Sequence, residues 1–376
     1  MEQQKGKRRK GCPLVSKPVI GILTSREGKR FAEPAYFRRL IREGRNLGAV
    51  VFLFSPDDVR ENSRRVRGFT PAVQGGWEER WYPWPDVAID RFRYSPTPAF
   101  KRYAAFRKRS GLLFANNRLA HKWNVHQVLW QDERMRKWLP ETYAYDSSRL
   151  QTMLRKHRSV YVKPSNGTGG RDILKIEQKG GGFLLQGHNQ QRSRRSAELS
   201  GARELARWVD RWVKNKKFLI QQGLDLQLIP GHNVDLRLLI QKNGEGNWSI
   251  TGAGARVGGK KNIASNLHAG GKAVPAAQFL TPLFGREQAE AILRECRDLA
   301  FQTVETIENH YGRMMEQGLD IGVDVNGRVW LIEVNPKPGR EIFREMRQRQ
   351  NYLESIRKPL QYALYLTRSM AKIHSS

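Results

Sequence analysis

The chain has 376 residues and carries 67 Lys and Arg against 36 Asp and Glu, a formal net charge of +31. A hydrophobic content of 39% and ten Trp exclude an intrinsically disordered chain, and the length allows two or three domains. No apolar run approaches the length of a membrane span, and two cysteines without CxxC spacing exclude a disulfide framework and favour a reducing cytoplasm.

The charge excess predicts anionic partners, such as nucleic acid, acidic polymers or acidic proteins. Basic residues cluster in a flexible N-terminal arm expected over 1–17, and again at 101–109, 192–195 and 203–217. We expect the last cluster to be a helix. No helix-turn-helix, zinc-finger or aromatic RNA-binding signature accompanies these clusters, so sequence-specific nucleic-acid recognition is not expected.

The first part of the chain predicts a parallel sheet. Residues 18–26 read as a buried strand, 31–47 as a helix and 49–55 as a second strand. A strand–helix–strand unit implies parallel pairing. After a polar, turn-rich stretch, 87–89 reads as another strand. The glycine fingerprint of dinucleotide sites does not follow the first strand, so a Rossmann cofactor is not supported.

Two lysines mark the middle of the chain. Residues 116–138 predict a helix with Lys122 at its mouth, and 160–176 predict a strand, a loop of small residues and a second strand. Lys163 ends the first of these strands. The backbone N–H groups of such a loop can approach phosphate oxygens. Many hairpins look similar, however, and the spacing is not that of a P-loop, so a phosphate site and an ordinary hairpin both remain open.

Three further strands are predicted at 218–224, 234–240 and 249–257. On the second of them Asp235 and Arg237 share one face, either as a structural ion pair or as ligand groups. Arg256 stands near the end of the third. An amphipathic helix over 287–310 should pack on the apolar face of the hairpin that follows it.

That hairpin covers 319–339 and is predicted to close with a two-residue turn at Asn326–Gly327. The turn would place Val325 opposite Arg328 and Asp320 opposite Glu333. Opposed like charges repel, so a basic side chain or a metal ion should lie between them. The carboxylates and the amide of Asn335 are hard ligands that suit Mg²⁺. The predicted core face holds Ile321, Val323, Val325, Trp330, Ile332 and Val334, and the polar face holds Asp320, Gly322, Asp324, Leu331, Glu333 and Asn335.

Taken in order, these motifs resemble those of the ATP-grasp superfamily of carboxylate–amine ligases, from about Asn116 to Gly339. The chain is less closely similar to the ligases that add glutamate to protein tails. More narrowly, it resembles the YheC/YheD group of spore-coat-associated ATP-grasp proteins, through NRLAHKW, LPET, VYVKPSNGTGGRDI, NLHAGGKA and EVNPKPGR.

The resemblance implies a mixed α/β (α+β) ATP-grasp fold behind an N-terminal parallel-sheet pre-ATP-grasp domain. The implied divisions are an arm at 1–17, the N-terminal domain at 18–110, the ATP-grasp domain at 111–345, and a helical segment with a tail at 346–376. Within the ATP-grasp domain, the nucleotide-binding subdomain covers about 150–225 and the metal and substrate subdomain about 230–345.

The resemblance also implies an activity. This is an ATP-dependent ligase using Mg²⁺ or Mn²⁺, joining a small-molecule or peptide carboxylate to an amine, or to a thiol, through an acylphosphate. It would act in the cytoplasm or at the spore coat, with coat proteins as further partners. The alternative is a non-catalytic or weakly active nucleotide-binding coat protein that binds anionic polymers.

Site residues follow from the same resemblance. Arg256 is the implied catalytic residue, and Asp320, Glu333 and Asn335 are the implied metal ligands. The implied nucleotide contacts are Lys122, Lys163, Ser165, Gly167, Thr168, Gly169, Gly170, Gln221, Gln222, Gly223, Leu224 and Asp235, and the implied substrate contacts are Arg237, Asn266, His268, Gly270 and Gly271.

Overall fold

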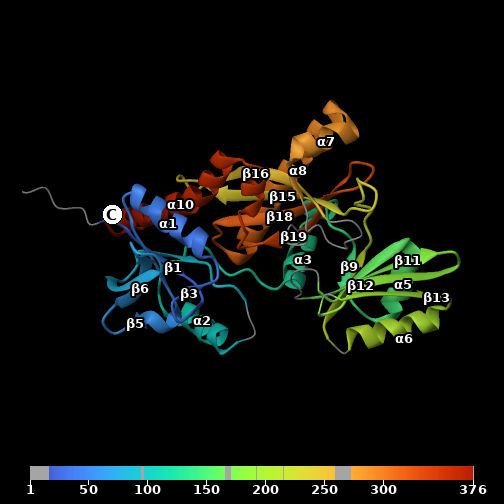
Figure 1. Cartoon of the computed structure of the whole chain (residues 1–376), viewed down its shortest axis with the longest axis horizontal. Coiled ribbons are helices and arrows are strands. Elements are labelled where there is room, and N and C mark those ends of the chain that lie inside the picture. The colour runs from blue at the N-terminus through green and yellow to red at the C-terminus, as the bar shows by residue number, and fades with distance from the viewer. Residues whose placement is uncertain are drawn as a thin grey trace, which may run out of the picture. The chain divides into compact units, whose positions relative to one another are not determined.

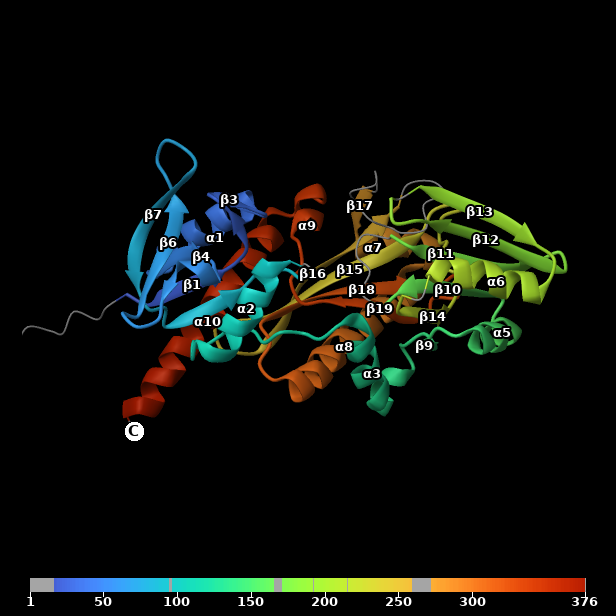
Figure 2. The ribbon, with the colours of Figure 1, turned by 90° about the horizontal axis from the view of Figure 1, so that it is seen from below.

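The computed structural model describes residues 17–375 except 95–96, 166–170, 192, 215 and 259–271. The expected N-terminal arm, apart from Lys17, lies outside the described residues. The chain forms two compact units, shown as ribbons in Figures 1 and 2. Unit 1 comprises 1–114 and 363–376, and unit 2 comprises 115–362.

Unit 1 is built on a sheet in the order β5-β6-β4-β1-β8, with β7 paired to β6. β1 and β8 pair in parallel, as do β1 and β4, and their apolar residues are buried on both faces. The predicted parallel unit is confirmed. The bounds are β1 Val19–Leu23, β2 Arg26–Glu27, β3 Arg30–Phe31, α1 Pro34–Asn46, β4 Val50–Phe54, a 3-10 helix Pro56–Asp58, β5 Val59–Arg60, β6 Arg65–Pro71, β7 Trp77–Pro83, β8 Val87–Asp90 and α2 Pro98–Arg109.

Two expectations for unit 1 were wrong in detail. The first helix begins at Pro34 rather than at residue 31, because the residues before it form the short β2–β3 hairpin. The stretch between β4 and β8 is not a plain loop, since it contains β6 and β7, paired antiparallel from Arg65–Pro83 to Pro71–Trp77.

Unit 2 contains an antiparallel sheet in the order β13-β12-β11-β10-β14-β9. Alternate residues of its strands pack against α5 and α6, and Val160 and Val162 of β10 belong to this core while Lys163 points to the other face. The bounds are β9 Thr142–Ala144, α5 Ser147–Lys156, β10 Ser159–Pro164, β11 Ile173–Lys179, β12 Gly182–His188, β13 Arg194–Leu199, α6 Ala202–Val213 and β14 Phe218–Gln222.

A second antiparallel sheet in unit 2 has the order β17-β16-β15-β18-β19. One face packs on α8, as predicted, and on α7 and α3; the end of the other face is covered by α9, through Ile342 and Phe343. The bounds are α3 Lys122–Gln131, α4 Glu133–Arg136, β15 Val234–Lys242, β16 Trp248–Val257, β17 Lys272–Pro275, α7 Ala276–Phe284, α8 Arg286–Tyr311, β18 Glu316–Val323, β19 Val329–Asn335, α9 Glu341–Glu345 and α10 Arg349–Ser375.

The helix predicted over 116–138 begins only at Lys122 and breaks at Asp132. The Asp132 carboxylate accepts hydrogen bonds from the backbone N–H of Arg134 (3.1 Å) and from the hydroxyl of Thr306 (2.6 Å) on α8. It therefore caps α4 and ties it to α8. Hydrogen bonds from Arg134 outweigh the effect of burial and lower the pKa of Asp132 to about 2.

The hairpin of β18 and β19 contains the predicted Asp320–Glu333 pair, but its loop and its register near the loop differ from the prediction. The loop has three residues, 325–327, because the backbone N–H of Asp324 bonds to the carbonyl of Arg328 (3.0 Å). Gly327 supplies the positive φ of +82° that this loop requires. Val325 is consequently 46% exposed, and not part of the core face as predicted.

A β-bulge at Ile332 then restores the register. Ile321 pairs with Leu331, whereas the adjacent Asp320 pairs with Glu333, so one extra residue stands on β19. Leu331 consequently lies in the core, and Ile332 lies beside Gly322 on the outer face. The prediction had these two residues reversed, and it also placed Trp330, which pairs with Gly322, on the wrong face.

The core between the second sheet and α8 includes the free thiol of Cys296, which is 3% exposed. Burial, with the nearby Glu295, raises the pKa of this thiol to about 12. The thiol lines a largely apolar cavity of about 330 Å³, together with Leu236, Leu238, Ile250, Ala253, Leu293, Arg297 and Ile321. Within the described ranges, every helix is too short or too polar to span a bilayer.

Candidate active site

Four charged side chains form a row across the outer face of β16, β15 and β18. Asp235 pairs in register with Arg256, and Arg237 pairs in register with Asp320. Both carboxylate oxygens of Asp235 accept from Arg256 at 2.6 Å, and those of Asp320 accept from Arg237 at 2.5 and 3.0 Å. Asp235 and Arg237 share a face, as predicted, but each bonds to a neighbouring strand.

Arg256 links the two carboxylates, because its Nη2 also lies 3.1 Å from Oδ2 of Asp320. Burial opposes the charged form of Asp320, yet Arg237 and Arg256 outweigh it and lower the pKa of Asp320. Burial likewise opposes the charge on Arg256, but Asp320 and Asp235 together raise the pKa of Arg256. Both shifts favour the charged forms of Asp320 and Arg256, although the side chains of the row are at most 16% exposed.

Glu333 extends the row to β19, where it faces Asp320. Its Oε1 lies 2.8 Å from Nζ of Lys122, the first residue of α3. Asn335 lies one pair further on, and its Nδ2 is 3.4 Å from Oδ2 of Asp320. Of the two possibilities left open for these opposed acids, basic side chains hold them in this structure.

Lys163 approaches from the first sheet. Its Nζ donates to the side-chain oxygen of Gln221 (2.7 Å), whose amide nitrogen donates to the hydroxyl of Thr142 (2.8 Å). Burial and the charge of Lys122 lower the pKa of Lys163 to about 8, although Glu333 acts in the opposite direction. The two predicted lysines, one at the start of α3 and one on β10, therefore lie close enough to repel each other.

His126 is a site neighbour that the sequence reasoning missed. It lies one turn after Lys122, between the rings of Trp123 and Trp130. Burial, and secondarily the charge of Lys163, lowers its pKa to about 4, so the imidazole is neutral at pH 7. The four-residue spacing from Lys122 was the available signal.

Several predicted nucleotide contacts already use their backbone N–H groups in hydrogen bonds within the protein. The backbone N–H of Gln222 donates to the carbonyl of Glu141, and that of Gly223 donates to the carbonyl of Ser159, both at 2.8 Å. The N–H of Ser165 likewise donates to the carbonyl of Lys217 (3.0 Å). These three N–H groups are occupied. Of the predicted contacts from Gln222 to Leu224, we therefore expect Leu224 to be the one that can donate its N–H to the base of a nucleotide.

Eight predicted contacts lie outside the described residues. They are Gly167, Thr168, Gly169 and Gly170 of the small-residue loop, and Asn266, His268, Gly270 and Gly271. Their assignments rest on the sequence alone.

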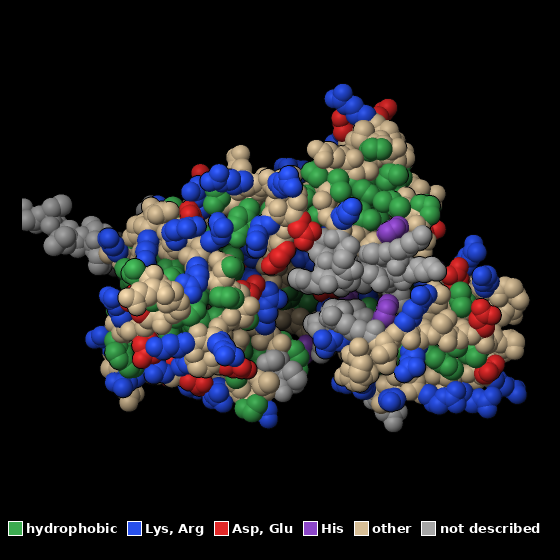
Figure 3. Space-filling model, viewed as in Figure 1, with side chains coloured by type: hydrophobic (Ala, Val, Ile, Leu, Met, Phe, Trp, Pro, Cys, Tyr) green, Lys and Arg blue, Asp and Glu red, His purple; other side chains and the backbone are tan. Residues whose placement is uncertain are grey.

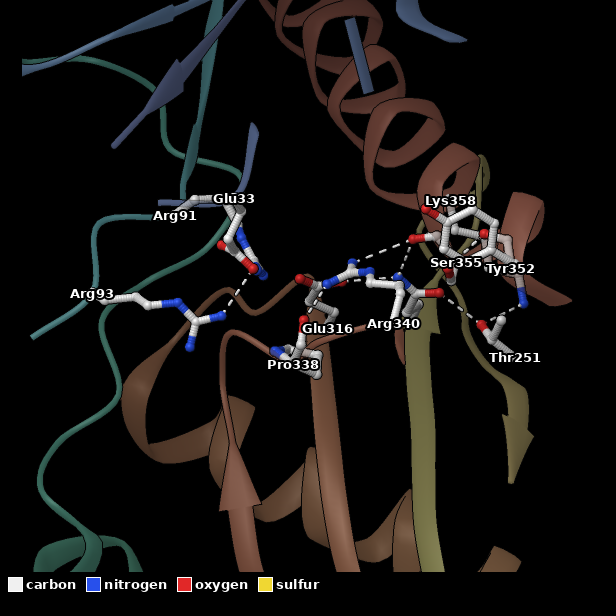
Figure 4. Close-up of polar contacts among 11 residues, drawn as sticks. Glu33, Arg91, Arg93, Thr251, Glu316, Pro338, Arg340, Tyr352, Ser355 and Lys358 are labelled. Atoms are coloured by element: carbon white, nitrogen blue, oxygen red, sulfur yellow. Dashed lines mark hydrogen bonds and ion pairs between the residues drawn. The ribbon is translucent and has the colours of Figure 1, made fainter. Parts of the chain in front are cut away.

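The chain beyond Asn335 folds back over β18, and a buried polar network holds it there. Arg340 donates to the carbonyl of Pro338, to the carboxylate of Glu316 and to the carbonyl of Ser355 on α10 (Figure 4). Arg340 and Glu316 are 4% and 2% exposed. Because Asn335 immediately precedes this fold-back, the network fixes the end of the candidate metal-binding strand.

We expect Gly318→Ala to disturb this fold-back. Gly318 pairs with Asn335, and a Cβ at Gly318 would lie 2.7 Å from Cβ of Pro338. Overpacking of this kind typically lowers the free energy of unfolding by about 1–3 kcal/mol. Urea denaturation measures the loss, with Gly244→Ala, whose Cβ would meet Gln361 only at 3.4 Å, as the matched control. Equal stabilities for the two variants would contradict the close approach.

The donor set fits Mg²⁺. Asp320, Glu333 and Asn335 lie on adjacent strands and offer two carboxylates and one amide oxygen, the hard ligands this ion prefers. No three His, Cys, Asp or Glu side chains of the described ranges gather as metal ligands, here or elsewhere, so this set depends on the amide of Asn335. Lys122, Lys163, Arg237 and Arg256 outnumber the three nearby carboxylates by one, so the region attracts an anion such as a polyphosphate.

A YheC/D-like ATP-grasp family model matches residues 111–366. The chain belongs to this family. It is 27% identical over 363 residues to the endospore coat-associated protein YheD of Bacillus subtilis, covering 94% of this chain and 79% of YheD. It is 24% identical over 317 residues to YheC of the same organism, covering 82% of this chain and 86% of YheC.

Three solved structures share the fold. The D-cycloserine synthetase DcsG matches with a TM-score of 0.54 at 12% identity, over 94% of this chain and 99% of DcsG. The ATP-grasp ligase PsnB, complexed with a minimal precursor, matches with a TM-score of 0.53 at 14% identity, over 92% of this chain and all of PsnB. The D-alanine–D-alanine ligase of Coxiella burnetii matches with 0.50 at 11%, over 96% of this chain and 98% of the ligase. The predicted family and fold class are confirmed.

Proposed function

We propose that this YheC/D-like protein is an ATP- and Mg²⁺-dependent ligase that joins a carboxylate to an amine or a thiol through an acylphosphate. The observation that carries the proposal is the row of paired acidic and basic side chains from Arg256 to Glu333, with Lys122 and Lys163 beside its acidic end. Such a set of fixed charges can bind a nucleotide and stabilise a transferring phosphoryl group.

The basic side chains of the site have separate proposed roles, beginning with the two lysines. Lys122 and Lys163 bind the phosphates, and Lys122 exchanges Glu333 for a phosphate oxygen when the nucleotide enters. Leu224 offers its backbone N–H to the base. Asp320, Glu333 and Asn335 would hold the Mg²⁺ ion, which neutralises charge on the phosphates when bound.

Arg256 stabilises the phosphoryl group as it moves to the substrate carboxylate. Its guanidinium is a planar fork of donors, which suits phosphate oxygens. Asp235 orients that fork through two hydrogen bonds and is a positioning residue in this proposal, in place of the nucleotide contact that the resemblance implies. Arg237, held by Asp320, is the proposed ligand of the substrate carboxylate. The incoming amine then attacks the acylphosphate and phosphate leaves.

The coat-associated names of the two relatives support a place at the spore coat. The substrates would be small-molecule or peptide acids and amines. A coat protein that binds nucleotide without turnover is the competing function, and release of ADP across panels of acids and amines separates the two.

Glu333→Gln tests the metal assignment. The ion pair of Glu333 with Lys122 is 30% and 39% exposed, so its loss should change the free energy of unfolding of the free protein by less than about 1 kcal/mol. Thermal stabilisation by ATP with Mg²⁺, and any ADP release, should be lost. Thermal melts with chelator and with Mg²⁺–ATP measure both effects.

Glu177→Gln is the matched control, since Glu177 pairs with Lys175 at 3.1 Å with similar exposures of 29% and 23%. It should keep the nucleotide response. If Glu333→Gln also kept that response, the assignment of Asp320, Glu333 and Asn335 to a metal would have to be withdrawn.

A further inference from the structure

The outer side of α6 carries a line of basic side chains, called the α6 ridge here and comprising Arg203, Arg207, Arg211 and Lys214. All four are exposed, and they lie opposite the buried positions of the helix at Leu205, Val209 and Val213. Figure 3 shows Lys and Arg side chains gathered along the border of the molecule where α6 lies in Figure 1. The ridge lies on a different face of the first sheet from Lys163.

The ridge differs from other basic helix positions of the described residues in its lack of ion pairs. Among the described residues, no ion pair joins any of its four members to a carboxylate, whereas Arg149 pairs with Asp146 and Arg286 with Glu290 on other helices. The two acids of α6 are Glu204, which is exposed in the first turn, and Asp210, which accepts hydrogen bonds from Tyr145 and Ser147.

The ridge places three arginines at four-residue intervals along α6. Like charges four residues apart on a helix repel, and Arg203 stands in the first turn, where the helix dipole favours a negative charge. An anionic partner bound to the ridge would relieve the repulsion between these side chains.

The spacing of the ridge fits an extended chain. Positions four apart on a helix are about 6 Å apart along its axis. Alternate residues of an extended polypeptide are about 6.7 Å apart and lie on one side. Acidic side chains at alternate positions of an extended peptide would therefore meet Arg203, Arg207 and Arg211 in turn.

Arg195 on β13 adds to the same surface. It pairs with Gly187 and so points to the side of the sheet where a Cβ at Gly187 would lie 3.2 Å from the ring of Trp212 on α6. Arg195 is exposed and lies on the same side of the sheet as α6.

A nucleic-acid strand fits this surface less well. Single-stranded nucleic acids bind through basic side chains interleaved with aromatic rings on which bases stack. The aromatic residues of α6, Trp208 and Trp212, stack on each other and pack against the sheet. We propose that the α6 ridge, with Arg195, is a binding surface for an acidic polypeptide in extended conformation.

The test compares two triple variants of equal net charge. One is Arg203→Gln, Arg207→Gln and Arg211→Gln on the ridge. The control is Arg42→Gln, Lys101→Gln and Lys108→Gln, which are exposed helix positions of unit 1. The probe is a labelled peptide of about sixteen residues with glutamate at alternate positions, so that its extended length exceeds the ridge. Fluorescence anisotropy at low and physiological salt measures the affinity.

We expect the ridge variant to bind the peptide about tenfold more weakly and the control variant to differ from wild type by less than about twofold. Both should melt no lower than wild type, and the ridge variant higher if repulsion is relieved. Equal weakening by both triples, or no peptide binding by wild type, would overturn the proposal. Tighter, ridge-dependent binding of an oligonucleotide of the same charge would assign the surface to nucleic acid instead.

Discussion

Asp235→Asn should lower the free energy of unfolding by about 3 kcal/mol, since removal of one partner from a buried ion pair leaves the other charge uncompensated. Arg256 and Asp235 are 8% and 10% exposed and share two hydrogen bonds of 2.6 Å. Arg256 would keep only its 3.1 Å contact with Asp320, which places the loss at the lower end for such pairs. Urea denaturation measures it.

A double-mutant cycle separates the pair from its surroundings. Arg256→Gln should also destabilise, and the combined variant should lose less than the two single losses together, because no charge is then left alone at that end of the row. A loss below about 1 kcal/mol for Asp235→Asn would mean that the pair adds little to the fold.

Lys163→Met should remove most of the thermal stabilisation by Mg²⁺–ATP. A hydrogen bond to a charged group contributes about 1.5–3 kcal/mol, so the affinity should fall by roughly ten- to a hundredfold. The melting temperature then rises less at a given nucleotide concentration, by mass action. Lys179→Met, an exposed lysine at the end of β11, is the control and should respond like wild type. A wild-type response in Lys163→Met would exclude Lys163 as a phosphate ligand.

The same lysine makes nucleotide binding depend on pH. Its pKa is lowered from 10.5 to about 8 by burial and by Lys122, so the protonated form that binds phosphate is lost as pH rises through 8. Affinity should fall above that pH in wild type, and Lys163→Met should lack this step. The free protein should change in the opposite sense, gaining stability between about pH 8 and 10.5, where the unfolded chain binds more protons.

The sequence alone allowed prediction of site residues whose positions depend on local pattern. Lys163 at a strand end, Lys122 at a helix start and the Asp320–Glu333 pair were all predicted, and the structure brings them together. The partners of Asp235 and Arg237 were not, because they lie on strands whose register is set by packing of the whole sheet. Asp235 bonds to β16 and Arg237 to β18, and nothing within their own strand indicates which neighbour each would meet.

Two local features were also beyond pattern reasoning. The bulge at Ile332 is invisible in an alternating sequence, which is why Leu331 and Ile332 were assigned to each other's faces. The break at Asp132 depends on the hydroxyl of Thr306, which is 174 residues away in the chain. A contact with a distant element accompanies the break at Asp132, whereas the bulge at Ile332 offsets the three-residue loop of its own hairpin.

The buried thiol of Cys296 can serve as a probe of local opening in the second sheet. Its thiol is enclosed between α8 and the strands, and its raised pKa keeps the reactive thiolate scarce. A thiol reagent can modify it only when α8 moves away from the sheet. In a variant with Cys12 replaced by serine, the rate of modification measures how often α8 separates from the sheet. Slower modification in the presence of nucleotide would show that ligand binding stabilises the contact between α8 and the sheet.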